Sequence, residues 1–294
     1  MMIIETVAIM APGHMGHAIG GHLVKAGLKV ITNLEGRSDA TLARAASAGI
    51  IDVGSDSALV GEADILLSIL APTHALEFAR RTAKAVDREH ADILFVDCNA
   101  ISPATAAEVA AILGAVGTAC VDASIRGGAP LGGRPQPRIY ASGPGADDFR
   151  ALSQYGLDIQ CIGSKPGQAS GLKICAASVS KGVVLLMIQA FVVARALGVE
   201  KELREELQSH AAFKGAERRA PNLGPDAYRW AGEMDEIAGT FAATGLSPKT
   251  FEGFAALCRL AESTSMGAET KETMAPGQNL DDISDILLRA LAEN

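Results

Sequence analysis

The sequence has 294 residues, of which 48% are hydrophobic and 20% charged, and this mixture excludes a disordered chain. The length accommodates about two domains, each with its own core. The formal net charge of -8, without a run of lysines or arginines, argues against a nucleic-acid partner.

We expect a cytoplasmic protein outside any membrane. No basic-then-apolar signal begins the chain, and the apolar stretch Val183–Val193 is too short to span a bilayer. The five cysteines are odd in number, lie far apart and form no Cys-x-x-Cys pair, which is typical of reduced thiols. Cys175 is interpreted as a packed, small apolar residue.

The first predicted element is a short apolar strand, Thr6–Met10, which leads through the glycine turn Ala11-Pro-Gly-His-Met-Gly16 into a helix. A helix N-terminus presents unpaired N–H groups and a positive dipole end, so it suits a phosphate. Gly13 allows the backbone to approach a pyrophosphate, and Gly16 allows the helix to pack closely on the strand. The usual first glycine is Ala11 here, so an ordinary strand-to-helix turn is the alternative interpretation.

The first half of the chain alternates short strands with amphipathic helices, which predicts a Rossmann-type, doubly wound parallel sheet. Further strands are expected at Lys29–Thr32, Ile65–Ile69, Ile93–Asp97 and Ala119–Asp122, and helices at Ala40–Ala48, Thr73–Val86 and Pro103–Leu113. Two more strand candidates, Arg138–Ser142 and Leu157–Ile162, are expected to extend the far edge of the sheet.

After Pro166 the pattern is helical throughout. The expected helices are Gly167–Leu197, Glu202–Ala216, Ala227–Thr244, Thr250–Glu262 and Asp281–Ala292, with breaks that include Pro221-Asn-Leu-Gly-Pro225. We therefore expect a dinucleotide-binding domain over residues 1–164 and an all-helical substrate and dimerisation domain over residues 165–294. The apolar stretch in the long helix favours burial against a second subunit, and hence a homodimer.

Five motifs follow one another in an order that resembles the β-hydroxyacid dehydrogenase superfamily, which includes 3-hydroxyisobutyrate and 6-phosphogluconate dehydrogenases. They are Gly13-His-Met-Gly16, Ser68-Ile-Leu-Ala-Pro72, Val96-Asp-Cys-Asn-Ala-Ile-Ser-Pro103, Asp122-Ala-Ser-Ile-Arg-Gly-Gly128 and Gly167-Gln-Ala-Ser-Gly-Leu-Lys-Ile-Cys175. Three other segments resemble a bacterial, phosphogluconate-dehydrogenase-like branch with its own C-terminal domain: Leu34–Ser38, Ala176–Gly182 and Arg229–Ile237. The resemblance implies contacts to the cofactor from His14, Met15, Leu70, Ala71, Pro72 and Asn99.

Lys173 matches the lysine that the superfamily uses as its general acid/base. Hydride transfer to a carbonyl leaves an alkoxide that needs a proton, and an ammonium in a dry cleft can supply it. Lys173 shares one helix face with the small residues Ala176, Ala177 and Ser180, which leaves room for a substrate between the domains. The alternative is a solvated lysine on the helix surface.

The substrate loop departs from the better-known members. Arg126 replaces the serine before Gly127-Gly128, and its guanidinium fork suits a carboxylate or phosphate, although a surface loop charge is the alternative. Ser124 and both glycines are expected at the substrate. Lys181 lies about 12 Å further along the helix, where it binds a distal anionic group or faces solvent.

The C-terminal domain departs from the family as well. The usual asparagine is Ala177, and the usual Lys-Asp pair aligns with Glu233-Met234. Glu233 is expected to pair with Arg229 one helical turn earlier.

The sequence favours NADP as the cofactor. The second strand ends at Asn33 without the acidic residue that NAD enzymes place on the ribose, and Arg37-Ser38 suits a 2′-phosphate. The contrary interpretation, with NAD bound through Glu35, stays open. His14, His17 and His22 lie on a turn whose N–H groups suit a phosphate, so no metal is expected.

Together these features predict an NAD(P)-dependent oxidoreductase acting on a small hydroxy acid-like substrate. An oxidative decarboxylase of a phosphorylated sugar acid, an imine reductase and a non-catalytic dinucleotide-binding module are the alternatives.

Overall fold

The computed structural model describes residues 3–270, 273–274 and 278–293. The chain divides into two compact units, residues 1–173 and 174–294. The division falls inside helix α7 (Gln168–Leu197), whereas the sequence suggested a boundary after residue 164. The two units are described separately.

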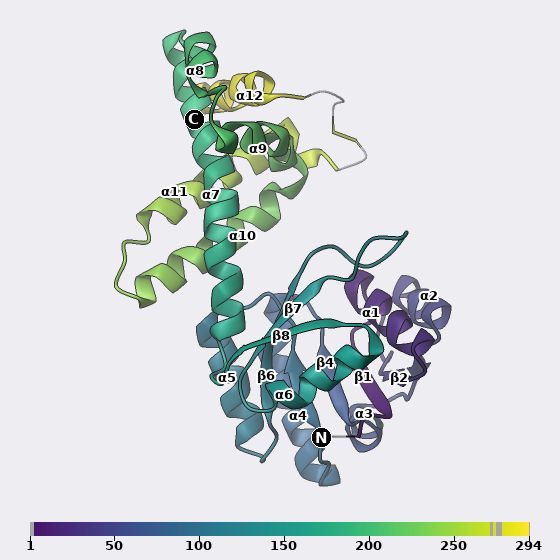
Figure 1. Ribbon diagram of the computed structural model, residues 1–294. Helices are drawn as coiled ribbons and strands as arrows, with labels where there is room; N and C mark the ends of the chain where they lie inside the picture. The colour runs from purple at the N-terminus through teal and green to yellow at the C-terminus, as the bar shows by residue number, and fades with distance from the viewer. Residues whose placement is uncertain (1–2, 271–272, 275–277, 294) are drawn as a thin grey trace. The chain divides into compact units, whose positions relative to one another are not determined.

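The first unit contains an eight-stranded sheet with the order β3-β2-β1-β4-β5-β6-β7-β8 (Figure 1). The strands are β1 (Thr6–Met10), β2 (Lys29–Thr32), β3 (Ile51–Asp52), β4 (Ile65–Ser68), β5 (Leu94–Asp97), β6 (Cys120–Arg126), β7 (Arg138–Ser142) and β8 (Asp158–Gly163). The six strands from β3 to β6 are parallel, β7 is antiparallel to β6, and β8 is parallel to β7. The predicted doubly wound sheet is thereby confirmed.

Helices cover both faces of this sheet. They are α1 (His14–Lys25), α2 (Asp39–Ala48), α3 (Asp56–Glu62), α4 (Ala75–Glu89), α5 (Pro103–Gly114) and α6 (Ala146–Phe149). Alternation along β1 sends Val7 and Ile9 into one apolar cluster, with Ile19 of α1, and Ala8 and Met10 into the other. Helix α3 and strand β3 were not predicted.

One row of paired residues crosses the sheet where β1, β4 and β5 end. It runs through Met10, Ser68, Asp97, Asp122, Ser142 and Gly163, each the register partner of the next. Strand β6 continues for four residues beyond this row to Arg126, paired with β7, which corresponds to about 13 Å at roughly 3.3 Å per residue. The carboxyl edge of the sheet therefore carries a projecting two-stranded ribbon.

Helices are the only regular secondary structure among the described residues of the second unit, as expected. Beyond α7 it contains α8 (Glu200–Leu207), α9 (Ala211–Arg219), α10 (Leu223–Ala243), α11 (Lys249–Glu262) and α12 (Leu280–Glu293). The single helix expected over Glu202–Ala216 is wrong, because α8 ends at Leu207 and α9 begins at Ala211. The break expected over Pro221–Pro225 is confirmed only in part, because α9 ends at Arg219 and a 3-10 turn occupies Ala220–Asn222. Helix α10 begins at Leu223, and Pro225 lies in its first turn, where a proline needs no N–H partner.

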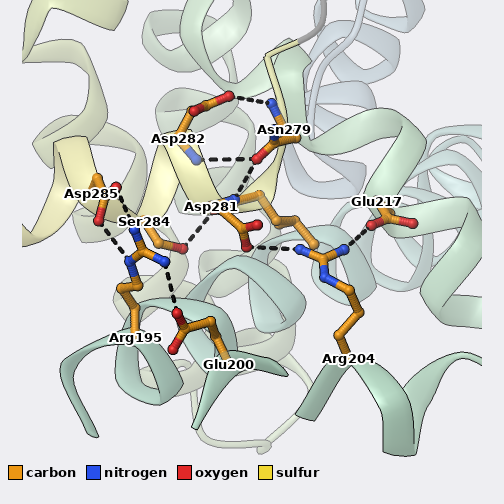
Figure 2. Close-up of polar contacts among 10 residues, drawn as sticks. Arg195, Glu200, Arg204, Glu217, Asn279, Asp281, Asp282, Ser284 and Asp285 are labelled. Atoms are coloured by element: carbon orange, nitrogen blue, oxygen red, sulfur yellow. Dashed lines mark hydrogen bonds and ion pairs between the residues drawn. The ribbon is translucent and has the colours of Figure 1, made fainter. Parts of the chain in front are cut away.

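Two arginines tie the helices of this unit together (Figure 2). Arg195 of α7 donates to Asp285 of α12 at 2.8 Å and to Glu200 of α8 at 2.7 Å. Arg204 of α8 binds Asp281 of α12 at 2.7 Å and Glu217 of α9. Its guanidinium also lies over the stacked rings of Phe191 and Phe213.

Helix α7 has the length and the composition of a membrane span, with a mean hydropathy of 1.9 in its most apolar window. The apolar run Val183–Val193 is too short on its own, but the whole helix is not. Its residues Val184, Leu185, Ile188 and Phe191 form part of the core of the helical unit. A core helix of a soluble domain passes the same test of length and hydropathy, so this one helix does not indicate a membrane protein.

Candidate active site and cofactor site

The glycine turn opens helix α1 without a side-chain cap. Gly13 occupies the N-cap position, and the N–H groups of His14, Met15 and Gly16 have no hydrogen-bond partner among the described residues. Helices α3 and α5 differ, because Ser55 and Ser102 cap them. Free N–H groups at a helix start form the arrangement that binds a pyrophosphate.

Gly16 is required for the close approach of α1 to the sheet. A Cβ on Gly16 would lie 2.1 Å from the carbonyl oxygen of Ala11, whereas a Cβ on Gly13 would meet no atom within 4 Å. Gly16 therefore acts in packing, as the sequence suggested, and Gly13 leaves open space beside the backbone. The ring of His17 is oriented by Nδ1, which lies 2.7 Å from the carbonyl oxygen of Gly13.

A pocket of about 260 Å³ opens beside the ends of β2 and β4. Its lining residues come from the turn after β2, from the segment between β4 and α4, and from α4: Glu35, Gly36, Arg37, Leu70, His74, Glu77, Phe78 and Arg81. Within the described residues, the only polar contact of the Arg37 guanidinium is to the Sδ atom of Met10 at 3.8 Å. A thioether is a weak acceptor, so this half-buried cation has no anionic partner.

Arg81 and His74 are pocket residues that the sequence did not reveal. Arg81 donates to Asp56 through Nε at 3.0 Å and Nη2 at 2.7 Å. Asp56 also accepts from Asn33 at 2.8 Å. The signal available in the sequence was their position after Ala71-Pro72, with His74 just before α4 and Arg81 on it.

Asn33 shapes the turn after β2 from a buried position. Its side chain is 1% exposed, donates to Asp56 and accepts from the N–H of Glu35 at 3.0 Å. Ser38 is exposed at the start of α2, where its hydroxyl lies 3.2 Å from that of Thr41. The role of Asn33 seen here is structural, and its contact with a cofactor stays a prediction.

Asn99 joins the ends of β4 and β5. Its buried amide donates to Ser68 at 2.8 Å and to Asp97 at 3.0 Å, and its oxygen accepts from the N–H of Leu70. Leu70 is thereby fixed beside the pocket, and the following residues, Ala71 and Pro72, are exposed. Asn99 thus holds the loop that the sequence assigned to the cofactor.

Lys173 lies in the second turn of α7 and is partly buried. Among the residues that the structure describes, its ammonium forms no hydrogen bond and no ion pair. Burial above all, aided by the nearby Arg126 cation, lowers the pKa of Lys173 below its ordinary 10.5. The carboxylates of Asp122 and Asp97 oppose this shift. The lowered pKa brings the ammonium and the neutral amine closer in free energy than they are in a solvated surface lysine.

Asp97, the last residue of β5, and the following Cys98 lie near this ammonium. Burial, in the first place, raises the pKa of Asp97 from 3.8 to about 6, and Asp122 raises it further. Burial likewise raises the pKa of the Cys98 thiol far above its usual range, so it stays protonated. Cys175, by contrast, is exposed, and the expectation that it is packed is wrong.

The projecting part of β6 carries the expected substrate residues. Ser124 is 1% exposed, and its hydroxyl has no hydrogen-bond partner. Arg126 is half-buried and, within the described chain, has no ion-pair partner. Gly127 and Gly128 follow in an exposed turn. Gly127 has φ of 129°, a conformation that side chains other than glycine rarely adopt.

Lys181 belongs to the helical unit and does not face solvent. Its ammonium pairs with Glu233 and lies 6.0 Å from the ring centre of Trp230. Glu233 also binds Arg229 on its own helix, as predicted. An anionic substrate group would have to compete with Glu233 for Lys181, so the assignment of Lys181 to the substrate stays a prediction.

Two family models match the chain. The NAD binding domain of 6-phosphogluconate dehydrogenase matches residues 6–152, which are 147 of the 294 residues, and a domain of unknown function (DUF1932) matches residues 194–261. An uncharacterized 28.5 kDa protein of Methanothermus fervidus is 30% identical over 181 residues, which are 62% of this chain and 68% of that protein.

Solved structures share the fold over nearly the whole chain. Conserved protein MTH1747, described as structurally similar to 3-hydroxyacid dehydrogenases, is 28% identical with a TM-score of 0.73, over 90% of this chain and 100% of its own. The Mycobacterium tuberculosis 3-hydroxyisobutyrate dehydrogenase is 20% identical with a TM-score of 0.72, over 98% and 99% of the two chains. An imine reductase from Myxococcus stipitatus has been solved in complex with NADP+ and, as a variant, in complex with NAD+; both structures are 18% identical with a TM-score of 0.57. The NADP+ complex covers 96% of this chain and 99% of its own. The NAD+ complex covers 99% of this chain and 100% of its own.

The sheet, the uncapped glycine turn and the matched NAD-binding domain define a nicotinamide-dependent oxidoreductase. The chain belongs to the β-hydroxyacid dehydrogenase superfamily, with the NAD-binding domain of 6-phosphogluconate dehydrogenase as its matched family.

Proposed function

We propose that the protein is an NADP-dependent oxidoreductase that interconverts an alcohol and a carbonyl in a small molecule bearing a carboxylate or phosphate. Lys173 serves as its general acid/base. The observation that carries this proposal is the pair of neighbouring cations, Lys173 and Arg126, of which neither has an ion-pair partner within the described residues.

Lys173 moves the proton. A bound dihydronicotinamide supplies the hydride, and the carbonyl oxygen then needs a proton. The ammonium of Lys173 donates that proton as negative charge develops on the oxygen, and solvent restores it afterwards. In the direction of oxidation the neutral amine accepts the hydroxyl proton. The lowered pKa of Lys173 supports both roles, because it brings the two protonation states closer in free energy.

Arg126 holds the anionic group of the substrate. Two unpaired cations that lie close together repel one another, and Arg126 accordingly lowers the pKa of Lys173. A carboxylate or phosphate between them relieves this repulsion, and the guanidinium fork binds such a group through two parallel hydrogen bonds. The neighbouring Ser124 hydroxyl, without a partner of its own, supports a polar substrate.

Arg37 gives the preference for NADP. The pocket beside it holds a half-buried guanidinium whose only polar contact within the described residues is a thioether, so a 2′-phosphate supplies the missing counter-charge. Glu35 in the same pocket supports the contrary assignment to NAD through the ribose hydroxyls. Fluorescence titration of the purified protein with NADPH and NADH decides between the two.

The decisive test of the reaction is a substrate screen. Hydroxy acids, hydroxy amino acids and their phosphates are offered with NADP at alkaline pH, and reduction of the cofactor is read by absorbance. Oxidation of an anionic alcohol is expected. Turnover only with cyclic imines and NADPH, or release of carbon dioxide from a sugar acid phosphate, would replace the proposed reaction with one of the two alternatives. Cofactor binding without any turnover would indicate a binding module.

We also propose a homodimer in the cytoplasm. The exposed apolar residues Val179, Leu186 and Val193 recur every seven residues along α7, followed by Leu197. Such spacing forms one continuous stripe that a second copy can cover across a two-fold axis. Leu186→Glu is expected to lower the sedimenting mass to that of a monomer, whereas an unchanged mass would exclude this interface.

A further inference from the structure

The start of helix α7 is held by side chains from two strands. Asp122 of β6 accepts from the N–H of Gly167 at 2.9 Å and from the N–H of Ser170 at 3.0 Å. Its second oxygen accepts from the Ser170 hydroxyl at 2.6 Å. Ser142 of β7 accepts from the N–H of Ala169 at 3.0 Å and donates to Asp122 at 3.1 Å. Three backbone N–H groups at one helix end are therefore satisfied from the sheet.

This cap is buried, and the backbone that it holds has little room to move. Asp122 is 2% exposed and Ser142 is fully buried, so water does not compete for the N–H groups. Gly167 has φ of 94°, and a Cβ there would lie 2.9 Å from the carbonyl oxygen of Pro103. The backbone at the helix start is consequently confined between α5 and the Asp122 carboxylate. A carboxylate at a helix N-terminus is also favoured by the helix dipole.

Lys173 is the residue whose place this cap determines. It follows Ser170 by three positions, which is less than one helical turn. Its ammonium makes no hydrogen bond of its own within the described residues, so its position depends on the helix that carries it. The titratable groups that act on it are Asp97 at the end of β5, the following Cys98, and Asp122 and Arg126 of β6.

We propose that Asp122 is a positioning residue of the reaction, which fixes the first turn of α7 on the sheet and so holds the Lys173 amine over the carboxyl ends of β5 and β6. The inference rests on the proposed role of Lys173 as the acid/base. The role of Asp122 differs from that of Asp97 on the neighbouring strand. Among the described residues, the Asp97 carboxylate accepts hydrogen bonds from Asn99 alone.

The two aspartates provide a matched pair of variants. Asp122→Asn and Asp97→Asn each remove one carboxylate charge beside Lys173, but only the first replaces an acceptor oxygen of the α7 cap with an NH2 group, which cannot accept. Hydrogen exchange of residues 167–171, read by mass spectrometry, is expected to quicken about tenfold in Asp122→Asn, the equivalent of losing one helix cap. Exchange in Asp97→Asn is expected to stay at the wild-type rate. Equal exchange in the two variants would overturn the proposal.

The second measurement follows the Lys173 amine itself. Reductive methylation with ¹³C-formaldehyde allows its pKa to be titrated by NMR, with Lys173→Arg assigning the signal. The double variant Ser142→Ala, Ser170→Ala weakens the cap without a change of charge. The pKa of Lys173 is expected to rise toward that of an ordinary lysine, because the burial that lowers it is relaxed. In Asp97→Asn it is expected to fall, since an attracting charge is lost.

An unmoved pKa of Lys173 in the double serine variant would contradict the positioning role. If Asp122→Asn does not fold, the double serine variant supplies both readouts. Neither measurement uses turnover, so the result is separable from the proposed function. Unchanged turnover in Lys173→Ala would remove the acid/base role and leave the exchange data standing.

Discussion

Asp97 and Asp122 lie directly opposite one another on the neighbouring parallel strands β5 and β6, and they bind different parts of the molecule. Asp97 accepts from the backbone and side chain of Asn99, and Asp122 accepts from the first turn of α7. One carboxylate thus orders the loop that follows β5, and the other orders the helix that carries Lys173. Both carboxylates act on the same ammonium, because each raises the pKa of Lys173.

Lys173→Ala is expected to lower turnover by about a hundredfold or more while cofactor affinity stays unchanged, because only the proton transfer is lost. Steady-state kinetics and NADPH titration measure the two quantities. Lys165→Ala is the matched control, since Lys165 is exposed and lies just before the same helix. Wild-type turnover in Lys173→Ala would refute the acid/base role.

Arg126→Gln is expected to raise KM for the anionic substrate about 10- to 100-fold, the usual range for a lost charge-assisted hydrogen bond. It is also expected to shift the pH profile. Alcohol oxidation needs neutral Lys173, so its rate rises with pH through the lowered pKa of that amine. Removing the Arg126 cation raises this pKa, and the rise in rate moves to higher pH. Arg138→Gln serves as the control, because Arg138 faces Arg126 across the strands and is already paired with Asp158.

Arg37→Ala is expected to weaken binding of NADPH about 10- to 100-fold and to leave binding of NADH nearly unchanged. The reason is that only the 2′-phosphate requires the cation. Isothermal titration with both cofactors gives the ratio. Arg80→Ala, on the exposed side of α4 and paired with Glu108, should alter neither affinity. A parallel loss for both cofactors would place Arg37 elsewhere in the site.

Stability is expected to depend on pH through Asp97. The folded-state pKa of about 6 lies above the ordinary 3.8, so between these values the folded protein holds a proton that the unfolded chain has lost. The contribution of Asp97 to stability is therefore fully present below pH 4 and is lost as the pH rises through 6, by roughly 3 kcal/mol in all. Asp97→Asn removes this dependence.

The measurement is urea unfolding of wild type and Asp97→Asn at pH 4.5, 5.5 and 7. Hydrogen exchange of the β5 amides is the readout of unfolding. Wild type should lose stability relative to the variant as the pH rises. The exposed Asp92→Asn provides the control. If the free energies of unfolding of wild type and Asp97→Asn differ by the same amount at every pH, Asp97 does not titrate in this range.

Arg204→Ala is expected to destabilise the helical unit by about 1–3 kcal/mol, because two ion pairs and the contact with the Phe191 and Phe213 rings are lost together. Trp230, the single tryptophan of the chain, is buried in the core of this unit and reports its unfolding by fluorescence. Lys201→Ala, whose side chain is 80% exposed, should leave the midpoint unchanged. Equal midpoints for the two variants would show that the Arg204 network adds nothing.

The sheet was predictable from the sequence because its strands carry a plain local signal. The bounds of β1, β2 and β7 agree with the prediction, since each is a short apolar run between turn residues. Strand β3 has only two residues, Ile51 and Asp52, too few for a pattern. The break between α8 and α9 falls at Gln208-Ser209-His210, which contains no glycine or proline.

The candidate site was predictable only where one segment carries the whole signal. The glycine turn and Lys173 belong to local motifs, whereas the cap on α7 joins residues separated by 45 and 48 positions in the chain. Arg81 lines the pocket because of its position on α4, and no sequence motif indicates this position. Local patterns predict elements and motifs. Contacts between residues on different strands and helices depend on the order of the strands, and only the structure shows them.

Strand β7 runs antiparallel to β6, so the connection between these two strands lies outside the parallel part of the sheet. The connection over residues 127–137 leaves and returns at the same edge, so insertions or exchanges there leave the pairing of the parallel strands intact. If the ribbon binds the substrate as proposed, sequence changes in this connection alter substrate choice without disturbing the parallel strands. Divergence of substrates within such a lineage would accordingly concentrate in about a dozen consecutive positions of the chain.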